Sequence, residues 1–550
     1  MRLNDYEKHL GDEMLAGRLS RRSFLIRASV AGLSIPTIGA VLAACGNSSE
    51  SAPSDGGTAA GGPPKAGGTL NVGLVTPSSQ VDPVFMIDVG AVDTVMMVGE
   101  YLCFPDADLT LRPRLATSWK AQDAKTWTFT LREGVKFHNG QPMTAADVVA
   151  TFDLITDPAT NSAASQSLGG VLSKGNTEKV DDHTVTFHLD RPYADFPYLV
   201  SAFGYNTVIL PKGYTPGEFT SKPVGTGPYM FKSYTPQVRA SLVKNPNYWQ
   251  PGRPYVDALN ISYFADPNAQ ILALQSGSID LIPSVEPSAL RAIKGNSSIV
   301  QLPAGSSSFQ SMQMRTDSGP LADKRIRQAL ALSLDRGALI STLMNGKGTV
   351  ANDHLFAPIF PVSEPVAKTI VQRKRDIEQA KTLLAAAGHP NGLSVELTTA
   401  RLFECVDHAT LIKQMAKDAG FDITLNILTP DAYFASGSNS PWLNSPLAIT
   451  NWGSRGSASQ IIEATVLTSS TSNSAHYANP TLDELVKTFD AELDQDKRAG
   501  IGTKIATILN DDVPLGISYF KNQVRVTAAK VHGAPAGPGD YPDLTNVWIS

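Results

Sequence analysis

The second half of the chain alternates between two hydrophobic periods, one typical of helices and one typical of strands. A helical pattern capped by Asp376 ends at Gly388, and a second one that begins at Glu404 ends at Gly420. After each glycine, every second residue is apolar. The predicted elements are helices over 376–387 and 404–419 and strands over 394–398 and 421–427. Repeated helix and strand units of this kind predict an α/β layer with parallel strands.

The first half shows a shorter alternation. Trp127, Phe129 and Leu131 are separated by single polar residues, which places all three on one face of a strand. Residues 135–138 are predicted as a second short strand, closed by the tight-turn pair Asn139-Gly140. We therefore expect two strands joined by a turn.

Two further helices are predicted from caps and spacing. Thr144 with Asp147 three residues later is a variant capping box, and an apolar stripe over 148–155 follows it. A helix near 326–334 also has one apolar face. Asp323 and Arg327 are expected to form an i, i+4 ion pair on it.

The first forty-five residues have the composition of an export signal. Arg21 and Arg22 lie in a basic segment that precedes a weakly apolar run over 28–40, and Leu42-Ala43-Ala44-Cys45 follows. The run is too short and too interrupted to supply the roughly 20 apolar residues of a membrane span. Residues 1–45 resemble a twin-arginine signal with a lipobox, which implies lipidation at Cys45. The alternative is a cytosolic chain in which these residues occur by chance.

The segment that follows supports a tether. Residues 46–67 contain no apolar side chain larger than alanine, so they cannot offset the entropy of ordering, and we expect a disordered leash. The remainder is long enough for two or three lobes. Without residues 1–44 the chain has 40 Lys and Arg against 47 Asp and Glu, a net charge of −7. This acidic balance argues against a nucleic-acid partner. We expect a monomer.

Known catalytic and metal-binding motifs are missing from the sequence. There is no G-x-S-x-G, H-E-x-x-H, P-loop or Cys/His cluster, so we predict no enzyme activity, no cofactor and no metal site. Glu404 and His408 share a helix face, which we interpret as a solvated surface. His476 is interpreted as a loop residue, with a contact to a metal-chelate ligand as the alternative.

The cysteines give a second prediction. Cys103 and Cys405 are far apart in sequence and are expected in different lobes, as two separate buried thiols. A disulfide between them is the alternative.

Several segments together resemble one family. Residues 115–119, 127–140 and 144–148 are similar to the characteristic stretch of the family 5 extracellular solute-binding proteins. This is the oligopeptide-, dipeptide- and nickel-binding family of ABC importers. Further similar segments follow in the same order, at 224–229, 245–249, 274–280 and 323–330. The resemblance covers about 69–550.

The resemblance implies a fold and a domain arrangement. It implies an α/β, two-lobed periplasmic-binding-protein fold of type II, with an inserted subdomain and a hinged cleft that closes on ligand. The expected parts are lobe I at 68–108, 223–305 and 510–550, the insertion at 109–222, and lobe II at 306–509. It also implies a membrane permease and its ATPases as partners.

The resemblance further suggests where a ligand binds. Peptide-binding relatives resemble Trp-x-x-Asp, in which the acid pairs with the α-ammonium of the peptide. This chain has Asn451, Trp452 and then Arg455 in place of the acid. An arginine would repel an ammonium but offers a fork for a carboxylate. We therefore expect an anionic group on the ligand, with a structural pairing of Arg455 to Glu463 or another acid of lobe II as the alternative.

Phe309 and Gln310 are weaker candidates for ligand contact. They follow an expected crossover between lobes, in a stretch that often faces the cleft in this family. A core position is the alternative for Phe309.

These observations predict the substrate-binding lipoprotein of an ABC importer, tethered to the outer face of the cytoplasmic membrane. It would capture a peptide or a related small solute and deliver it to a permease. Three alternatives stay open: a sensor that presents ligand to a membrane receptor, an importer component for a carboxylated, opine-like solute, and one for a metal chelate.

Overall fold

The computed structural model describes residues 62–550, except 288, 438–439 and 541. The predicted signal, Cys45 and nearly all of the leash lie outside these residues. The chain folds into two compact units. The first runs up to Val285 and also holds Ala292–Ala304 and Val524–Ser550, and the second holds Glu286–Arg291 and Gly305–Gln523.

Two segments of the predicted lobe I differ from these units. Residues 286–291 and 510–523, both assigned above to lobe I, belong to the second unit. For residues 510–523 the reason is that helix α18 (Gln495–Asp512) and the first part of strand β17 (Leu515–Ala528) pack within that unit, where β17 pairs with β12 and with β13 (Gly348–Val350). Only the last part of β17 belongs to the first unit.

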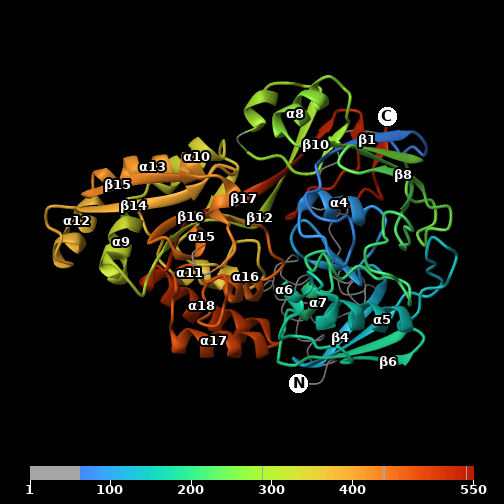
Figure 1. Cartoon of the computed structure of the whole chain (residues 1–550), viewed down its shortest axis with the longest axis horizontal. Coiled ribbons are helices and arrows are strands. Elements are labelled where there is room, and N and C mark those ends of the chain that lie inside the picture. Colours follow the sequence, from blue (N-terminus) through green and yellow to red (C-terminus); the bar gives the residue numbers. More distant parts are fainter. Residues whose placement is uncertain (1–61, 288, 438–439, 541) are drawn as a thin grey trace, which may run out of the picture. The chain divides into compact units, whose positions relative to one another are not determined.

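The first unit contains a mixed sheet of five strands in the order β11-β1-β10-β9-β8. Figure 1 labels β1, β10 and β8 of this sheet. Strand β1 pairs in parallel with β10 and β11, whereas β9 and β8 continue the sheet antiparallel. The strands are β1 (Thr69–Val75), β8 (Tyr229–Thr235), β9 (Arg239–Lys244), β10 (Ala258–Phe264) and β11 (Leu281–Ile282). Helices α4 (Val89–Met96) and α8 (Pro267–Gln275) start at the caps Asp88 and Asp266.

A separate antiparallel sheet lies within the predicted insertion. Its order is β4-β5-β7-β6, with β4 (Ala116–Asp123), β5 (Thr126–Leu131), β6 (Thr177–Asp181) and β7 (Thr184–His188). Trp127, Phe129 and Leu131 are all buried, as their alternation predicts. Helix α5 (Ala145–Thr156) begins with the predicted capping box of Thr144 and Asp147.

The strand predicted at 135–138 is wrong. This segment forms only an isolated bridge between Lys136 and Pro142. Both edges of β5 are already paired with β4 and β7, so no edge of β5 remains for it. Its alternation reflects the burial of Val135 and Phe137.

The second unit confirms the predicted helix and strand repeats. Its strands follow the order β15-β14-β16-β12-β17 (Figure 1), and β14 is parallel to both of its neighbours. The strands are β12 (Ile299–Met314), β14 (Leu393–Ala400), β15 (Phe421–Leu428) and β16 (Leu447–Trp452). The helices are α9 (Lys324–Leu332), α10 (Arg336–Leu343), α12 (Ile377–Ala386) and α13 (Cys405–Lys417). Apolar residues of these helices and strands form one core.

Shorter elements complete the second unit. The short helices α14 (Pro430–Tyr433) and α15 (Pro441–Asn444) form a small second cluster in which Tyr433 packs on Ala400 and Ala448. The remaining helices are α11 (Ser363–Thr369), α16 (Ala458–Thr465) and α17 (Pro480–Ala491).

The ion pair predicted between Asp323 and Arg327 is not formed. Asp323 caps α9 through the amide of Arg325 and pairs with the guanidinium of that residue. Arg327 is buried and donates hydrogen bonds to the carbonyl oxygens of Leu321 and Asp512. These backbone carbonyl oxygens accept the hydrogen bonds of the Arg327 guanidinium in place of the Asp323 carboxylate.

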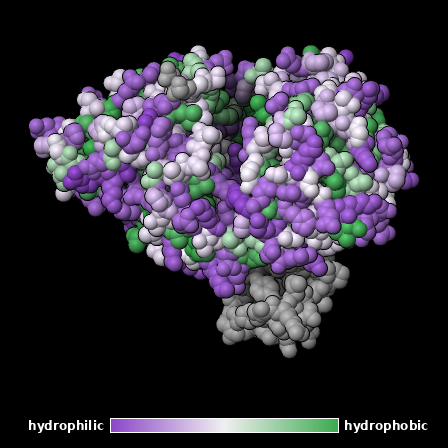
Figure 2. Space-filling model, turned by 60° about the horizontal axis from the view of Figure 1, so that its bottom comes forward, coloured by the Kyte–Doolittle hydropathy of each residue, from purple (hydrophilic) through white to green (hydrophobic). Residues whose placement is uncertain are grey.

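The visible surface in Figure 2 is mostly hydrophilic, with hydrophobic residues scattered among polar ones. Across the part of the chain that the structure describes, no helix combines the length and the apolar character that crossing a bilayer requires.

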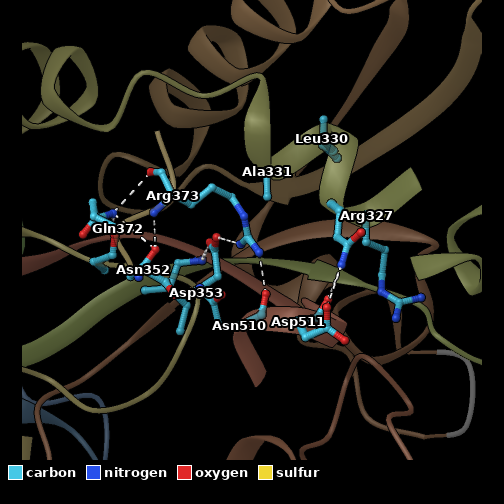
Figure 3. Close-up of polar contacts among 12 residues, drawn as sticks. Arg327, Leu330, Ala331, Asn352, Asp353, Gln372, Arg373, Asn510 and Asp511 are labelled. Atoms are coloured by element: carbon cyan, nitrogen blue, oxygen red, sulfur yellow. Dashed lines mark hydrogen bonds and ion pairs between the residues drawn. The ribbon is translucent and has the colours of Figure 1, made fainter. Parts of the chain in front are cut away.

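A buried ionic cluster connects several segments of the second unit (Figure 3). Asp353 is fully buried and has a left-handed backbone, with φ 54°. Its carboxylate accepts hydrogen bonds from Arg336 at 2.6 Å, from Arg373, and from the amide of Ile517 at 2.9 Å. Arg373 also donates to the carbonyl oxygen of Asn510. The Asp353 carboxylate thereby binds two cations and strand β17, and through Arg373 it also connects to the end of helix α18.

Replacing Asp353 by asparagine should destabilise the second unit. Asparagine tolerates the left-handed backbone, so the change chiefly removes the charge and leaves the buried guanidinium of Arg336 and the partly exposed one of Arg373 without a counter-charge. We expect a loss on the order of 3–5 kcal/mol, measured as a lower urea midpoint of tertiary structure. The control Glu484→Gln breaks an exposed pair with Lys487 and should leave the midpoint nearly unchanged. Equal midpoints for both variants would contradict this role of Asp353.

Candidate functional site

One strand pairing positions four of the five predicted site residues. In the antiparallel pairing of β12 with β16, Phe309 lies opposite Trp452 and Gln310 lies opposite Asn451. Successive side chains of a strand point to opposite faces of the sheet. The pair Phe309 and Trp452 therefore occupies one face, and the pair Gln310 and Asn451 occupies the other.

The first face carries a row of aromatic rings. Trp452 stacks on Phe309 at a centroid distance of 6.5 Å and contacts Trp442 at 6.4 Å. Trp442 in turn contacts Phe434 at 5.9 Å. Phe309 is completely buried, so it belongs to the core and supports Trp452 from beneath. The row ends at Phe434, whose exposed fraction of 40% offers apolar surface.

Sequence reasoning missed Trp442 and Phe434. Both lie at short helices that begin with proline, α14 and α15, and these segments are too short to show a period. An unusual concentration of aromatic residues between 433 and 452 is the signal that could have found them.

Arg455 lies in the loop that follows the aromatic strand. Its backbone is held by Ser307, whose Oγ accepts a hydrogen bond from the amide of Arg455 at 2.7 Å and donates to its carbonyl at 2.8 Å. The guanidinium donates to the carbonyl oxygen of Ser454 at 3.2 Å. Within the described residues it forms no ion pair with a carboxylate, Glu463 included. Its charge is available to a ligand.

The opposite face carries a buried ionic network around Lys521 of β17. The Nζ of Lys521 donates to Asn451 Oδ1, Glu286 Oε2 and Glu404 Oε2, each at 3.1 Å. The side chains of Lys521 and Glu404 are only 5% and 2% exposed. The ring of Phe403 lies 5.1 Å from the Lys521 Nζ and is 49% exposed.

Gln310 supports this network. It is fully buried, and its Nε2 donates to Glu404 at 3.3 Å. Its Oε1 accepts from the hydroxyl of Tyr519 at 3.2 Å and lies 2.9 Å from His408 Nδ1. Both ends of the amide are used inside the protein, so Gln310 orients its neighbours and does not face solvent.

The prediction of a solvated surface for Glu404 and His408 is wrong. Both side chains are buried, His408 completely. The periodicity correctly places them on one face of α13, but that face packs against Gln310 and Lys521 and not against water.

Burial and neighbouring charges shift the pKa values of this network. Burial and the nearby Glu286 raise the pKa of Glu404 to about 7. Burial lowers the pKa of Lys521, but Glu286 and Glu404 outweigh it and hold the pKa above its ordinary value. Burial, with a smaller effect of Lys521, lowers the pKa of His408 to about 3. His408 is therefore neutral at physiological pH.

The remaining candidates lie apart from these two faces. His476 Nε2 lies 3.0 Å from the carbonyl oxygen of Leu443, as expected of a loop residue. No group of three or more His, Cys, Asp or Glu side chains suited to a metal occurs in the described residues. Cys103 and Cys405 are free and buried, in different units, as predicted.

The family assignment rests on a match over most of the chain. Residues 110–473 match the description "Bacterial extracellular solute-binding proteins, family 5 Middle". The chain belongs to this family. Members are solute-binding proteins of ABC importers and not enzymes, so the predicted class of function is confirmed.

Relatives of this family 5 protein match most of the chain. It is 27% identical to Protein XP55 of Streptomyces lividans over 476 residues, which cover 79% of this chain and 83% of that protein. It is 25% identical to the oligopeptide-binding protein AppA of Bacillus subtilis over 520 residues, covering 89% and 93%.

A solved structure shows the same fold. The substrate-binding protein CtaP of Listeria monocytogenes superposes with a TM-score of 0.76 at 24% identity, covering 88% of this chain and 100% of that one. The predicted two-lobed α/β fold of periplasmic binding proteins is thereby confirmed.

The neutral state of His408 predicts a pH dependence of stability. Below pH 6.5, His408 takes up a proton in the unfolded chain, whereas in the folded protein it stays neutral down to about pH 3. The free energy of unfolding therefore falls as pH falls. We expect this histidine to contribute a slope of about 1 kcal/mol per pH unit in this window. Urea titrations at pH 6.5 and 5.0 should show a shallower slope for His408→Gln than for the wild type.

A matched control separates this effect from other groups. His389→Gln removes a partly exposed imidazole of the same unit and should keep the wild-type slope. Glu404 acts in the opposite direction, because its raised pKa makes stability fall as pH rises from about 4.5 to about 7. Glu404 is present in the wild type and in both variants, so its contribution cancels when their slopes are compared. An unchanged slope for His408→Gln would refute the prediction.

Proposed function

We propose that this protein captures a small, peptide-like solute with a carboxylate group at Trp452 and Arg455, and delivers it to a membrane permease driven by ATPases. The observation that carries the proposal is the guanidinium of Arg455, which no carboxylate of the described residues neutralises. Arg455 lies three residues after Trp452, which belongs to the aromatic row.

The chemistry of the two groups is complementary. A guanidinium forms two parallel hydrogen bonds to a carboxylate, and such charge-assisted bonds are among the stronger ones in proteins. The exposed end of the aromatic row, at Phe434, supplies apolar surface for the remainder of the solute. Capture requires no bond to be broken, because ligand only has to favour the closed conformation through contacts to both lobes.

Two solute classes have this chemistry. The name of the relative AppA supports a peptide, whose C-terminal carboxylate would meet Arg455. The arginine in the place of the acid of peptide-binding relatives supports a carboxylated, opine-like solute. Both classes share the carboxylate, which is therefore the first group to test.

The carboxylate contact can be tested with two forms of one peptide. Wild type should bind Ala-Phe more tightly than its C-terminal amide by about tenfold or more, since the amide loses the charge-assisted bonds. Arg455→Ala should abolish this preference in calorimetric titrations. The control Arg401→Ala removes an exposed arginine of the same unit and should retain it. Equal binding of acid and amide by the wild type would refute the contact.

We also propose that Cys45 is acylated and holds the mature protein on the outer face of the cytoplasmic membrane. The arrangement of Arg21, Arg22 and the Leu-Ala-Ala-Cys segment supports this. The Gly- and Ser-rich residues 46–67 would give the tethered domain reach.

Replacing Cys45 by serine should move the exported protein from the membrane fraction to the soluble fraction, because no acyl chains can be attached. Replacing Arg21 and Arg22 by lysine should instead leave the precursor inside the cell. The control Ser49→Ala should stay with the membrane. Membrane retention of the Cys45→Ser protein would rule out this anchor.

A further inference from the structure

We infer that Glu286, Glu404 and the ring of Phe403 form a second subsite, which takes a primary ammonium group of the solute. The inference rests on the proposed function and extends it to a solute that carries both charges. The two subsites start from consecutive residues of β16, Asn451 and Trp452, whose side chains lie on opposite faces of the sheet. A solute that uses both subsites therefore has to lie across the end of this strand, where the loop to Arg455 begins.

The charges of the network do not balance. Two carboxylates, Glu286 and Glu404, share the single ammonium of Lys521. The three N–H groups of that ammonium are all used, because the third one donates to Asn451. An excess negative charge in a buried position is costly unless a cation or a proton compensates it.

One acceptor of Glu404 is left without a donor. Its Oε2 accepts from Lys521 and Gln310, whereas its buried Oε1 has no hydrogen-bond partner within the described residues. The neighbouring His408 cannot supply a proton. Since Gln310 turns its Nε2 to Glu404, its Oε1 accepts from His408 Nδ1, and the His408 Nε2 then carries no hydrogen. In the free protein, the hydrogen bond between the carboxyl groups of Glu404 and Glu286 can hold one proton, and a cationic donor from a ligand can replace that proton.

The network is reachable from solvent on one side. The side chain of Glu286 is 30% exposed, and the ring of Phe403 is 49% exposed while lying against Lys521. Phe403 has a left-handed backbone with φ 48°, a conformation that is rare and costly for a bulky residue. The Phe403 ring already lies against the ammonium of Lys521, and an aromatic ring is a favourable wall for an ammonium group.

A proton occupies the place of the cation in the free protein. The raised pKa of Glu404, about 7, means that the carboxyl pair retains a proton in many molecules at neutral pH. The other titratable groups that act on Glu404 are Glu286, Lys521 and Tyr519 of β17, and Cys405 of α13. An arriving ammonium keeps its own proton, and the carboxyl proton is released to solvent.

The experiment compares three forms of one dipeptide: Ala-Phe, N-acetyl-Ala-Phe and the C-terminal amide of Ala-Phe. Calorimetry at pH 7 in two buffers of different ionisation enthalpy gives both affinity and proton release. We expect wild type to bind Ala-Phe about tenfold or more tightly than the acetylated form, with release of a fraction of a proton. The affinity for Ala-Phe should rise between pH 6 and pH 8.

The variants isolate the subsite. Glu404→Gln should weaken Ala-Phe about tenfold and abolish proton release, but leave the acetylated form unaffected. Phe403→Ala, at an exposed ring, tests the same subsite with little effect on packing. The control Asp407→Asn makes a carboxylate-to-amide change on the exposed face of α13 and should behave as wild type.

The outcomes separate the two proposals. Equal binding of Ala-Phe and its acetylated form by the wild type, or the same acetylation penalty in Glu404→Gln, would overturn the ammonium subsite alone. Equal binding of Ala-Phe and its amide would overturn the carboxylate contact alone. Failure of wild type to bind any of the three would overturn both.

Discussion

The pairing of β12 with β16 is the constraint on which both candidate subsites depend. It places Phe309 beside Trp452 on one face and Gln310 beside Asn451 on the other. A slip of one residue would exchange the two faces, burying the aromatic ring among carboxylates and the amide among aromatic rings. Such a slip is excluded because Met312 and Ile449, in the same register, already fill the core under α13.

The two ionic clusters of the second unit differ in the sign of their excess charge, which is positive around Asp353 and negative around Lys521. Asp353 receives two guanidiniums and a backbone amide, and Arg373 also uses a carbonyl oxygen, so that cluster acts as a structural clamp. The cluster of Lys521 holds two carboxylates and leaves an acceptor vacant. A carboxylate surrounded by an excess of cations fixes segments together, whereas an excess of carboxylates beside an exposed ring is suited to receive a cationic ligand.

The local signals in the sequence predicted much of the fold. The caps at Asp376 and Thr144 and the terminating Gly388 and Gly420 act over one helical turn, and the structure places helix ends there. Periodicity identifies the face that Glu404 shares with His408, but not what covers it. That depends on Lys521, more than a hundred residues away, and no local pattern encodes such a contact. Trp452 and Arg455 were found through the family resemblance alone.

The two cysteines of the described units have a practical consequence. Burial raises the pKa of Cys405 to about 12 and that of Cys103 further still, so both remain protonated and unreactive. The native state of these units needs no oxidation, and it is the same in a reducing and in an oxidising compartment. A single cysteine introduced on the surface would then be the reactive thiol for a fluorescent label, and lobe movement could be followed without removing the natural ones.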